Sequence, residues 1–134
     1  MGVRLTVRVD FGSGRALGPG KIRLLEAIGK TGSISRAGRS LSMSYRRAWL
    51  LVDDLNRCFR EAVVATQPGG ARGGGAALTA FGLELIEKYR SIEGAATVAS
   101  RRQLRDLEIS LRSRVRCTRR RLKTSIQAAA GRPV

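Results

Sequence analysis

The chain has 134 residues, enough for one domain with a hydrophobic core plus an appended segment. Its 26 lysines and arginines against 10 acidic residues give a formal net charge of +16, which favours a polyanionic partner, most commonly nucleic acid. The sequence has no histidine and two cysteines, so it offers neither the commonest general base nor a zinc or disulfide framework, and we expect no cofactor.

The first predicted element is a β-strand over residues 3–9. Its apolar residues alternate with polar ones, which is typical of a strand with one buried face. These apolar residues are Val3, Leu5, Val7 and Val9. The strand needs a partner, either a later short strand or a second copy of the chain. Residues 11–15 then form a glycine-rich turn, which lacks the Gly-Lys-Ser/Thr ending of a phosphate-binding loop.

Three short helices are predicted next. The first begins at Pro19, a position suited to proline, and ends at Gly32. Ser33 caps the second and Ser44 caps the third, because a serine hydroxyl can accept a hydrogen bond from a backbone N–H of the first turn. The residues expected to be buried are Ile22, Leu25, Ala27, Ile28, Ile34, Ala37, Leu41, Ala48, Val52 and Leu55.

The second and third helices, separated by a turn at residues 41–43, have the layout of a helix-turn-helix. The second helix of such a motif can lie in the major groove of DNA. Its start carries Tyr45, Arg46 and Arg47, which we expect to be exposed. Trp49 lies beside the buried stripe, and we expect it to pack in the core.

Residues 62–66 and 76–79 are predicted to form two short strands around a glycine-rich loop. A flexible linker is the alternative interpretation of such a loop. Because the stretch directly follows a recognition helix, we interpret it as a wing. Arg72 would supply a charge, and Gly73 and Gly74 would let the backbone approach the sugar-phosphate chain.

A long helix is predicted over residues 79–111, with Thr79 as its N-terminal cap. Its apolar stripe is longer than a small winged domain can cover. We therefore expect this helix to dimerise, and residues 1–111 to form the DNA-binding domain. Residues 112–134 hold eight basic and no acidic side chains, which predicts a disordered tail. No apolar run has the length of a membrane span or signal peptide, so we expect a cytoplasmic protein.

The chain resembles the N-terminal DNA-binding domain of ModE-type, molybdate-responsive regulators, which are winged helix-turn-helix proteins with a LysR-like helix-turn-helix. The resemblance covers about residues 3–92. The matching residues are Arg23-Leu24-Leu25-Glu26-Ala27-Ile28, Thr31-Gly32-Ser33-Ile34-Ser35, Met43-Ser44-Tyr45, Ala48-Trp49, Val52-Asp53 and Leu55-Asn56, then Leu78-Thr79, Phe81-Gly82 and Glu84-Leu85-Ile86 after the wing.

The resemblance implies a mostly α-helical fold with a small antiparallel β component, and a homodimer joined through the first strand and the long helix. It implies binding to an inverted-repeat operator in double-stranded DNA. Arg46 and Arg47 stand where the family more often has Lys-Thr, so the base sequence that they read need not be the family's. Molybdate-sensing members use a separate C-terminal ligand domain. The basic tail leaves no room for one, so we expect a stand-alone member and identify no small-molecule effector.

The leading hypothesis is a sequence-specific transcriptional regulator. A nucleoid-type DNA binder with little base preference and a winged-helix protein-interaction module are the alternatives. An enzyme is not expected, since no nucleophile–base pair or carboxylate dyad is apparent. The residues predicted to contact DNA are Ser33, Arg36, Ser44, Tyr45, Arg46, Arg47, Arg72, Gly73 and Gly74.

Overall fold

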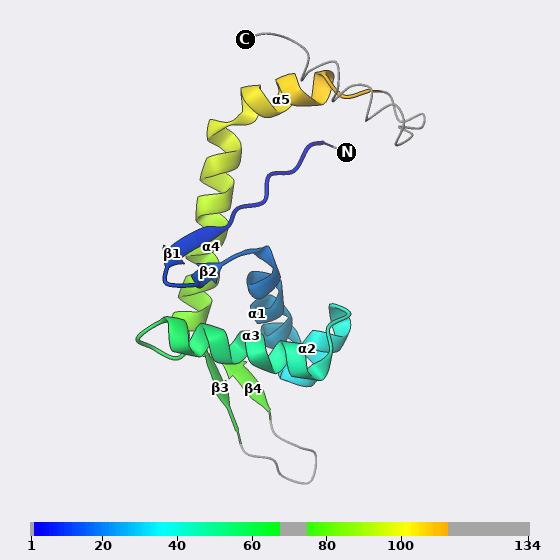
Figure 1. Cartoon of the computed structure of the whole chain (residues 1–134). Coiled ribbons are helices and arrows are strands. Elements are labelled where there is room, and N and C mark those ends of the chain that lie inside the picture. Colours follow the sequence, from blue (N-terminus) through cyan, green and yellow to red (C-terminus); the bar gives the residue numbers. More distant parts are fainter. Residues whose placement is uncertain (1, 68–74, 113–134) are drawn as a thin grey trace. The chain divides into compact units, whose positions relative to one another are not determined.

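The computed structural model describes residues 2–67 and 75–112. These residues contain five helices and two small antiparallel sheets, which confirms the prediction of a mostly α-helical winged fold (Figure 1). The described residues between 4 and 99 form one compact unit, and the described residues at the two ends, 2–3 and 100–112, belong to a second. Within the described ranges, no helix combines the length and apolar character that crossing a membrane requires.

The N-terminal strand is shorter than predicted and begins later. Strand β1 spans Val9–Gly12 and pairs antiparallel with β2, Arg15–Leu17. The expected strand over residues 3–9 is therefore wrong except at Val9. The reason is that Val9 lies opposite Leu17, after which the chain turns into a helix, so no residue of β2 remains to pair with residues 4–8.

Helix α1, Pro19–Thr31, supplies the centre of the core. Gly32 ends the helix in the left-handed conformation with φ of 69°, which glycine adopts without steric cost, and its N–H donates to the Ile28 carbonyl at 2.8 Å. The most completely buried apolar residues of the described chain pack together around this helix. They include Ile22, Leu24, Leu25, Ile28, Ala37, Ala48, Leu55, Val63 and Tyr89.

Helices α2, Ile34–Ser40, and α3, Tyr45–Cys58, form the predicted helix-turn-helix. Ser42 turns the chain between them with φ of 58°. The closest approach of the helices is at Gly38, where an added Cβ would lie 2.8 Å from the Cβ of Ala48. Ala37 is buried as expected, but the residue whose small size permits the crossing is Gly38.

The predicted wing is present as a hairpin of β3, Val64–Thr66, and β4, Ala76–Leu78. Gln67 donates its N–H to the Gly75 carbonyl at 2.9 Å, which continues the pairing toward the loop. Ala76 donates to the Gly32 carbonyl at 2.9 Å, so the hairpin is attached to the end of α1.

The single long helix expected over residues 79–111 is two helices, α4 at Ala80–Ala99 and α5 at Arg101–Ile109. Thr79 caps α4 as predicted, because its Oγ1 accepts the Gly82 N–H at 2.9 Å. Ser100 interrupts the helix. It stands at the N-cap of α5 with φ of −106°, and its carbonyl accepts the Leu104 N–H at 2.9 Å.

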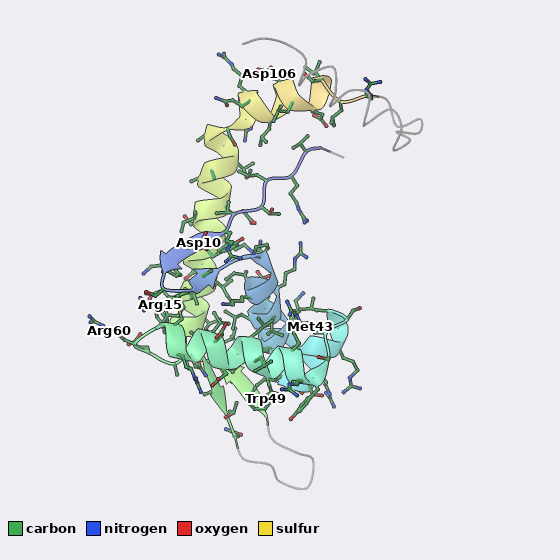
Figure 2. All side chains as sticks on the ribbon, viewed as in Figure 1. Asp10, Arg15, Met43, Trp49, Arg60 and Asp106 are labelled. Atoms are coloured by element: carbon green, nitrogen blue, oxygen red, sulfur yellow. The ribbon has the colours of Figure 1, made fainter. Side chains whose placement is uncertain are left out.

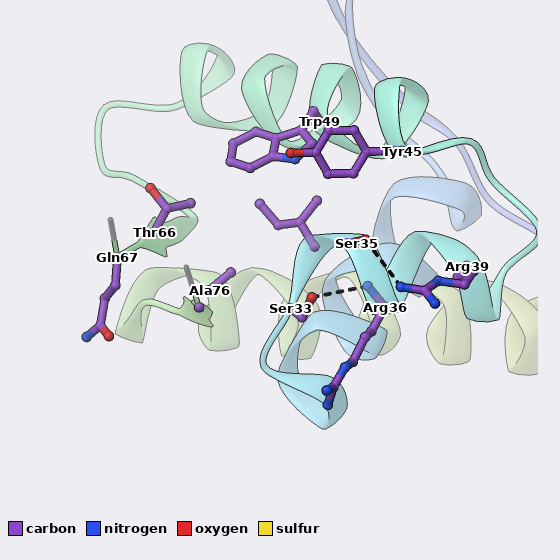
Figure 3. Close-up of a pocket in the computed structure, with 11 residues that line it drawn as sticks. Ser33, Ser35, Arg36, Arg39, Tyr45, Trp49, Thr66, Gln67 and Ala76 are labelled. Atoms are coloured by element: carbon purple, nitrogen blue, oxygen red, sulfur yellow. Dashed lines mark hydrogen bonds between the residues drawn. The ribbon is translucent and has the colours of Figure 1, made fainter. Parts of the chain in front are cut away.

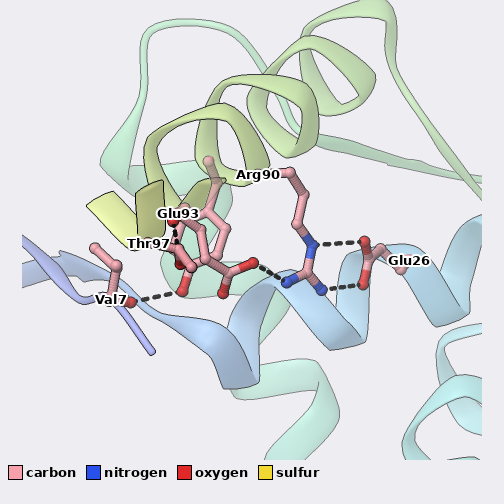
Figure 4. A network of polar contacts seen from close by, with 6 residues as sticks. Val7, Glu26, Arg90, Glu93 and Thr97 are labelled. Carbon is pink, nitrogen blue, oxygen red and sulfur yellow. Dashed lines mark hydrogen bonds and ion pairs between the residues drawn. The ribbon is translucent and has the colours of Figure 1, made fainter. Parts of the chain in front are cut away.

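Two polar contacts hold α4 in the 4–99 unit (Figure 4). Arg90 forms a bidentate ion pair with Glu26 of α1, with nitrogen–oxygen distances of 2.7 and 3.1 Å, and also pairs with Glu93 at 2.8 Å. These hydrogen bonds, to Glu26 first and then to Glu93, raise the pKa of Arg90. Tyr89 donates its hydroxyl to the Val7 carbonyl at 2.6 Å, which attaches the N-terminal segment to α4.

Candidate nucleic-acid interface

The start of α3 presents three polar or aromatic side chains to solvent. Ser44 caps the helix, since its Oγ accepts the Arg47 N–H at 3.1 Å. Ala48 and Val52 are buried on the opposite side, which directs the first turn outward. Tyr45 is 62% exposed, and Arg46 and Arg47 are also exposed, as the sequence predicts.

Trp49 is not a core residue, and the expectation that it packs in the core is wrong. The side chain is 38% exposed and does not belong to the core cluster of the described residues (Figure 2). The ring instead contacts Tyr45, one helical turn earlier, edge to face with centroids 6.1 Å apart. The core is complete without Trp49 because smaller residues, Ala48 and Val52, occupy the inward positions of α3.

The two aromatic rings border an open hollow of about 340 Å³ between α2, α3 and the wing (Figure 3). Arg36 and Arg39 of α2 belong to the lining, and Thr66 and Gln67 of β3 and its extension line the wing side. Ser33 lies at the same hollow, where its Oγ accepts the Arg36 N–H at 3.1 Å. The structure therefore brings Ser33, Arg36 and Tyr45 to one surface.

The arginines of this surface carry uncompensated charge. In the described part of the chain, Arg36, Arg39, Arg46 and Arg47 have no ion-pair partner within 4.0 Å. The two carboxylates of α3 have other partners, because Asp53 pairs with Arg57 at 3.1 Å and Asp54 with Lys21 at 3.6 Å. The four guanidinium groups are thus suited to phosphates or guanine edges.

Asn56 fixes the wing to α3, a role that sequence reasoning missed. Its Oδ1 accepts the N–H groups of Val63 and Val64 at 2.7 and 3.1 Å, and its Nδ2 donates to the Val64 carbonyl at 3.2 Å. The sequence signal that could have indicated this role is an amide side chain that directly follows the buried Leu55 and stands shortly before a β-prone run. Arg72, Gly73 and Gly74, predicted to contact DNA from the wing, lie outside the described residues.

Comparison with known proteins gives a consistent set of relatives. The chain is 41% identical over 90 residues to the molybdenum transport protein ModE of Azotobacter vinelandii, and 45% identical over 89 residues to the molybdenum-pterin-binding protein MopB of Rhodobacter capsulatus. It is 38% identical over 71 residues to the DNA-binding transcriptional dual regulator ModE of Escherichia coli. No protein-family model matches the chain.

These alignments cover 67%, 66% and 53% of the chain, respectively. They cover 33%, 33% and 27% of the relatives, so the chain spans about a third of the length of the curated proteins that it matches. The likeness accordingly concerns one part of these longer proteins.

Proposed function

Because the chain is homologous to ModE-type proteins over as much as 67% of its length, we propose that it is a DNA-binding transcriptional regulator. In this proposal α3 enters the major groove of DNA, α2 crosses the sugar-phosphate backbone, and the wing contacts DNA beside the groove that α3 occupies. The observation that carries it is the start of α3, where Arg46 and Arg47 are exposed and have no ion-pair partner among the described residues.

Alanine substitutions test the proposal. Arg46→Ala and Arg47→Ala should each weaken binding to a cognate duplex by about 1–3 kcal/mol where the arginine contacts a base. Gel-shift titrations on cognate and scrambled duplexes measure this loss. Arg60→Ala is the matched control, because it removes the same charge from an exposed position outside α3. Equal losses on both duplexes would indicate phosphate contacts alone, and equal losses for all three variants would contradict the proposal.

We further propose that the regulator is a homodimer on an inverted-repeat operator. Residues 4–8 alternate between exposed and half-buried side chains but form no strand within the described chain. On α4, Ile92 continues the stripe of Leu85 and Tyr89, yet it is 47% exposed. A second copy pairing with this segment and covering Ile92 would account for both observations.

Sedimentation measurements test the dimer. Ile92→Glu should shift the chain toward monomer, because a charge at the covered stripe would be desolvated without a partner. Leu83→Glu is the control, since Leu83 is exposed on the opposite face of α4. A wild-type chain that sediments as a monomer at concentrations where it binds DNA would refute the dimer.

The alternative of a DNA binder with little base preference is favoured by the net charge of +16. The affinity for a selected duplex, divided by the affinity for a scrambled one at the same salt concentration, separates the two functions. A specific regulator binds its own site at least about 10³-fold more tightly.

A further inference from the structure

The exposed aromatic pair on α3 is an apolar feature in a hollow that Arg36 and Arg39 also line. Trp49 and Tyr45 lie one helical turn apart, and their rings pack edge to face with centroids 6.1 Å apart. Burying a large aromatic side chain normally stabilises a fold by a few kcal/mol, yet Trp49 remains 38% exposed. The fold therefore leaves this apolar surface available.

The surroundings of Trp49 restrict what could cover it. The hollow that it borders is also lined by Arg36 and Arg39, so a partner there must combine negative charge with an apolar group. Duplex DNA in the major groove has both, because phosphates border the groove and the C5-methyl of thymine projects into it. The arginines are suited to ion pairs with the phosphates, and the indole is suited to an apolar contact with the methyl group.

Resting on the proposed function, we infer that Trp49 contacts a thymine methyl group in each half-site and is a specificity-determining residue. Tyr45 acts as a positioning residue, since its ring holds the indole by the edge-to-face contact. Arg46 and Arg47 would contribute hydrogen bonds and charge, whereas Trp49 would distinguish thymine from bases without the methyl group.

Replacing thymine by uracil tests the inference, because the exchange removes only the C5-methyl group. The probe is the tightest-binding duplex selected from a random pool, with each thymine replaced in turn. For the wild-type chain, at least one replacement in each half-site should weaken binding about fourfold, the factor for burying one methyl group. In Trp49→Ala the same replacement should have no effect, whereas the control Leu83→Ala, exposed on α4, should keep the fourfold difference.

Fluorescence provides a readout that needs no variant. Trp49 is the single tryptophan of the chain, so its emission should shift to the blue on binding the thymine duplex, and less on binding the uracil duplex. Uracil replacements that never weaken binding, uracil sensitivity that persists in Trp49→Ala, or an unchanged emission would each overturn the inference. If the wild-type chain still prefers the selected duplex over a scrambled one, such a result overturns only the role of Trp49 and leaves the proposed function standing. A chain with no preference for any duplex would instead refute the proposed function.

Discussion

At the scale of single residues, Tyr89 and its neighbour Arg90 connect α4 to the N-terminal segment and to α1. The Tyr89 side chain is 1% exposed in the core, its hydroxyl donates to the Val7 carbonyl at 2.6 Å, and its helix neighbour Arg90 pairs with α1. Burial first, and the nearby Glu93 second, raise the pKa of the Tyr89 phenol above its ordinary value of 10.0. The fold therefore favours the neutral phenol.

Tyr89→Phe should lower the free energy of unfolding by about 1 kcal/mol at neutral pH, the usual net contribution of one hydrogen bond. Because the folded-state pKa of Tyr89 is raised, its contribution is complete below pH 10 and is lost as pH rises through the folded-state value. Urea unfolding at several pH values measures this dependence. The wild-type chain should lose more stability above pH 10 than the Phe variant, and identical losses would contradict the assignment.

Residue-level reasoning from the sequence succeeded where the cause is local. The caps at Ser33, Ser44 and Thr79 depend on bonds to a backbone N–H three residues away, so the residue type and its position predict them. The prediction that Trp49 packs in the core failed because its exposure depends on which side of α3 the rest of the fold covers. Which of the exposed side chains touch DNA stays a prediction.

At the scale of elements, the crossing of α2 and α3 depends on Gly38. An added Cβ would lie 2.8 Å from Ala48, tighter than real Cβ contacts allow, so one helix would have to shift. Gly38→Ala should therefore destabilise the fold by about 1–3 kcal/mol. Gly20→Ala is the matched control. Nothing lies within 4 Å of its added Cβ, and alanine is the better helix former.

Urea denaturation followed by circular dichroism compares the two glycine variants. The expected order of stability is Gly20→Ala at or above wild type, and Gly38→Ala clearly below it. If the two variants were equally stable, the helices would not be limited by this contact.

Other element boundaries could not be predicted because they depend on partners. The alternation in residues 4–9 correctly indicated which side chains face solvent, whereas Val3, predicted on the buried face, is 40% exposed. Pairing required a strand opposite, and β2 ends at Leu17. The apolar stripe of residues 79–111 continues through Ser100, although the helix does not. Hydrophobic spacing predicts which face is apolar and is less informative about where a helix is interrupted.

At the scale of the whole molecule, the charge is concentrated in two parts of the sequence. Residues 1–60 have a net charge of +8, residues 61–111 a net charge of zero, and residues 112–134 a net charge of +8. The last segment, predicted to be disordered, lies outside the described residues except for Arg112. Its composition favours phosphate contacts that add affinity for any sequence.

Deleting the residues after Leu111 should flatten the dependence of DNA affinity on salt. Each phosphate contact that is lost reduces the slope of log affinity against log salt by about 0.9. Binding measured over a salt series, with the full chain as reference, gives both slopes. An unchanged slope would mean that this segment does not contact DNA.

The proposed function requires the start of α3 to lie in the major groove of a duplex. Photo-cross-linking from a photoreactive amino acid in place of Arg46, with position 60 as the comparison, tests it most directly. We expect cross-links from position 46 to bases in two clusters about 34 Å apart, or a multiple of that spacing, and none from position 60. Cross-links from position 60 alone, or equal cross-linking from both positions, would contradict it.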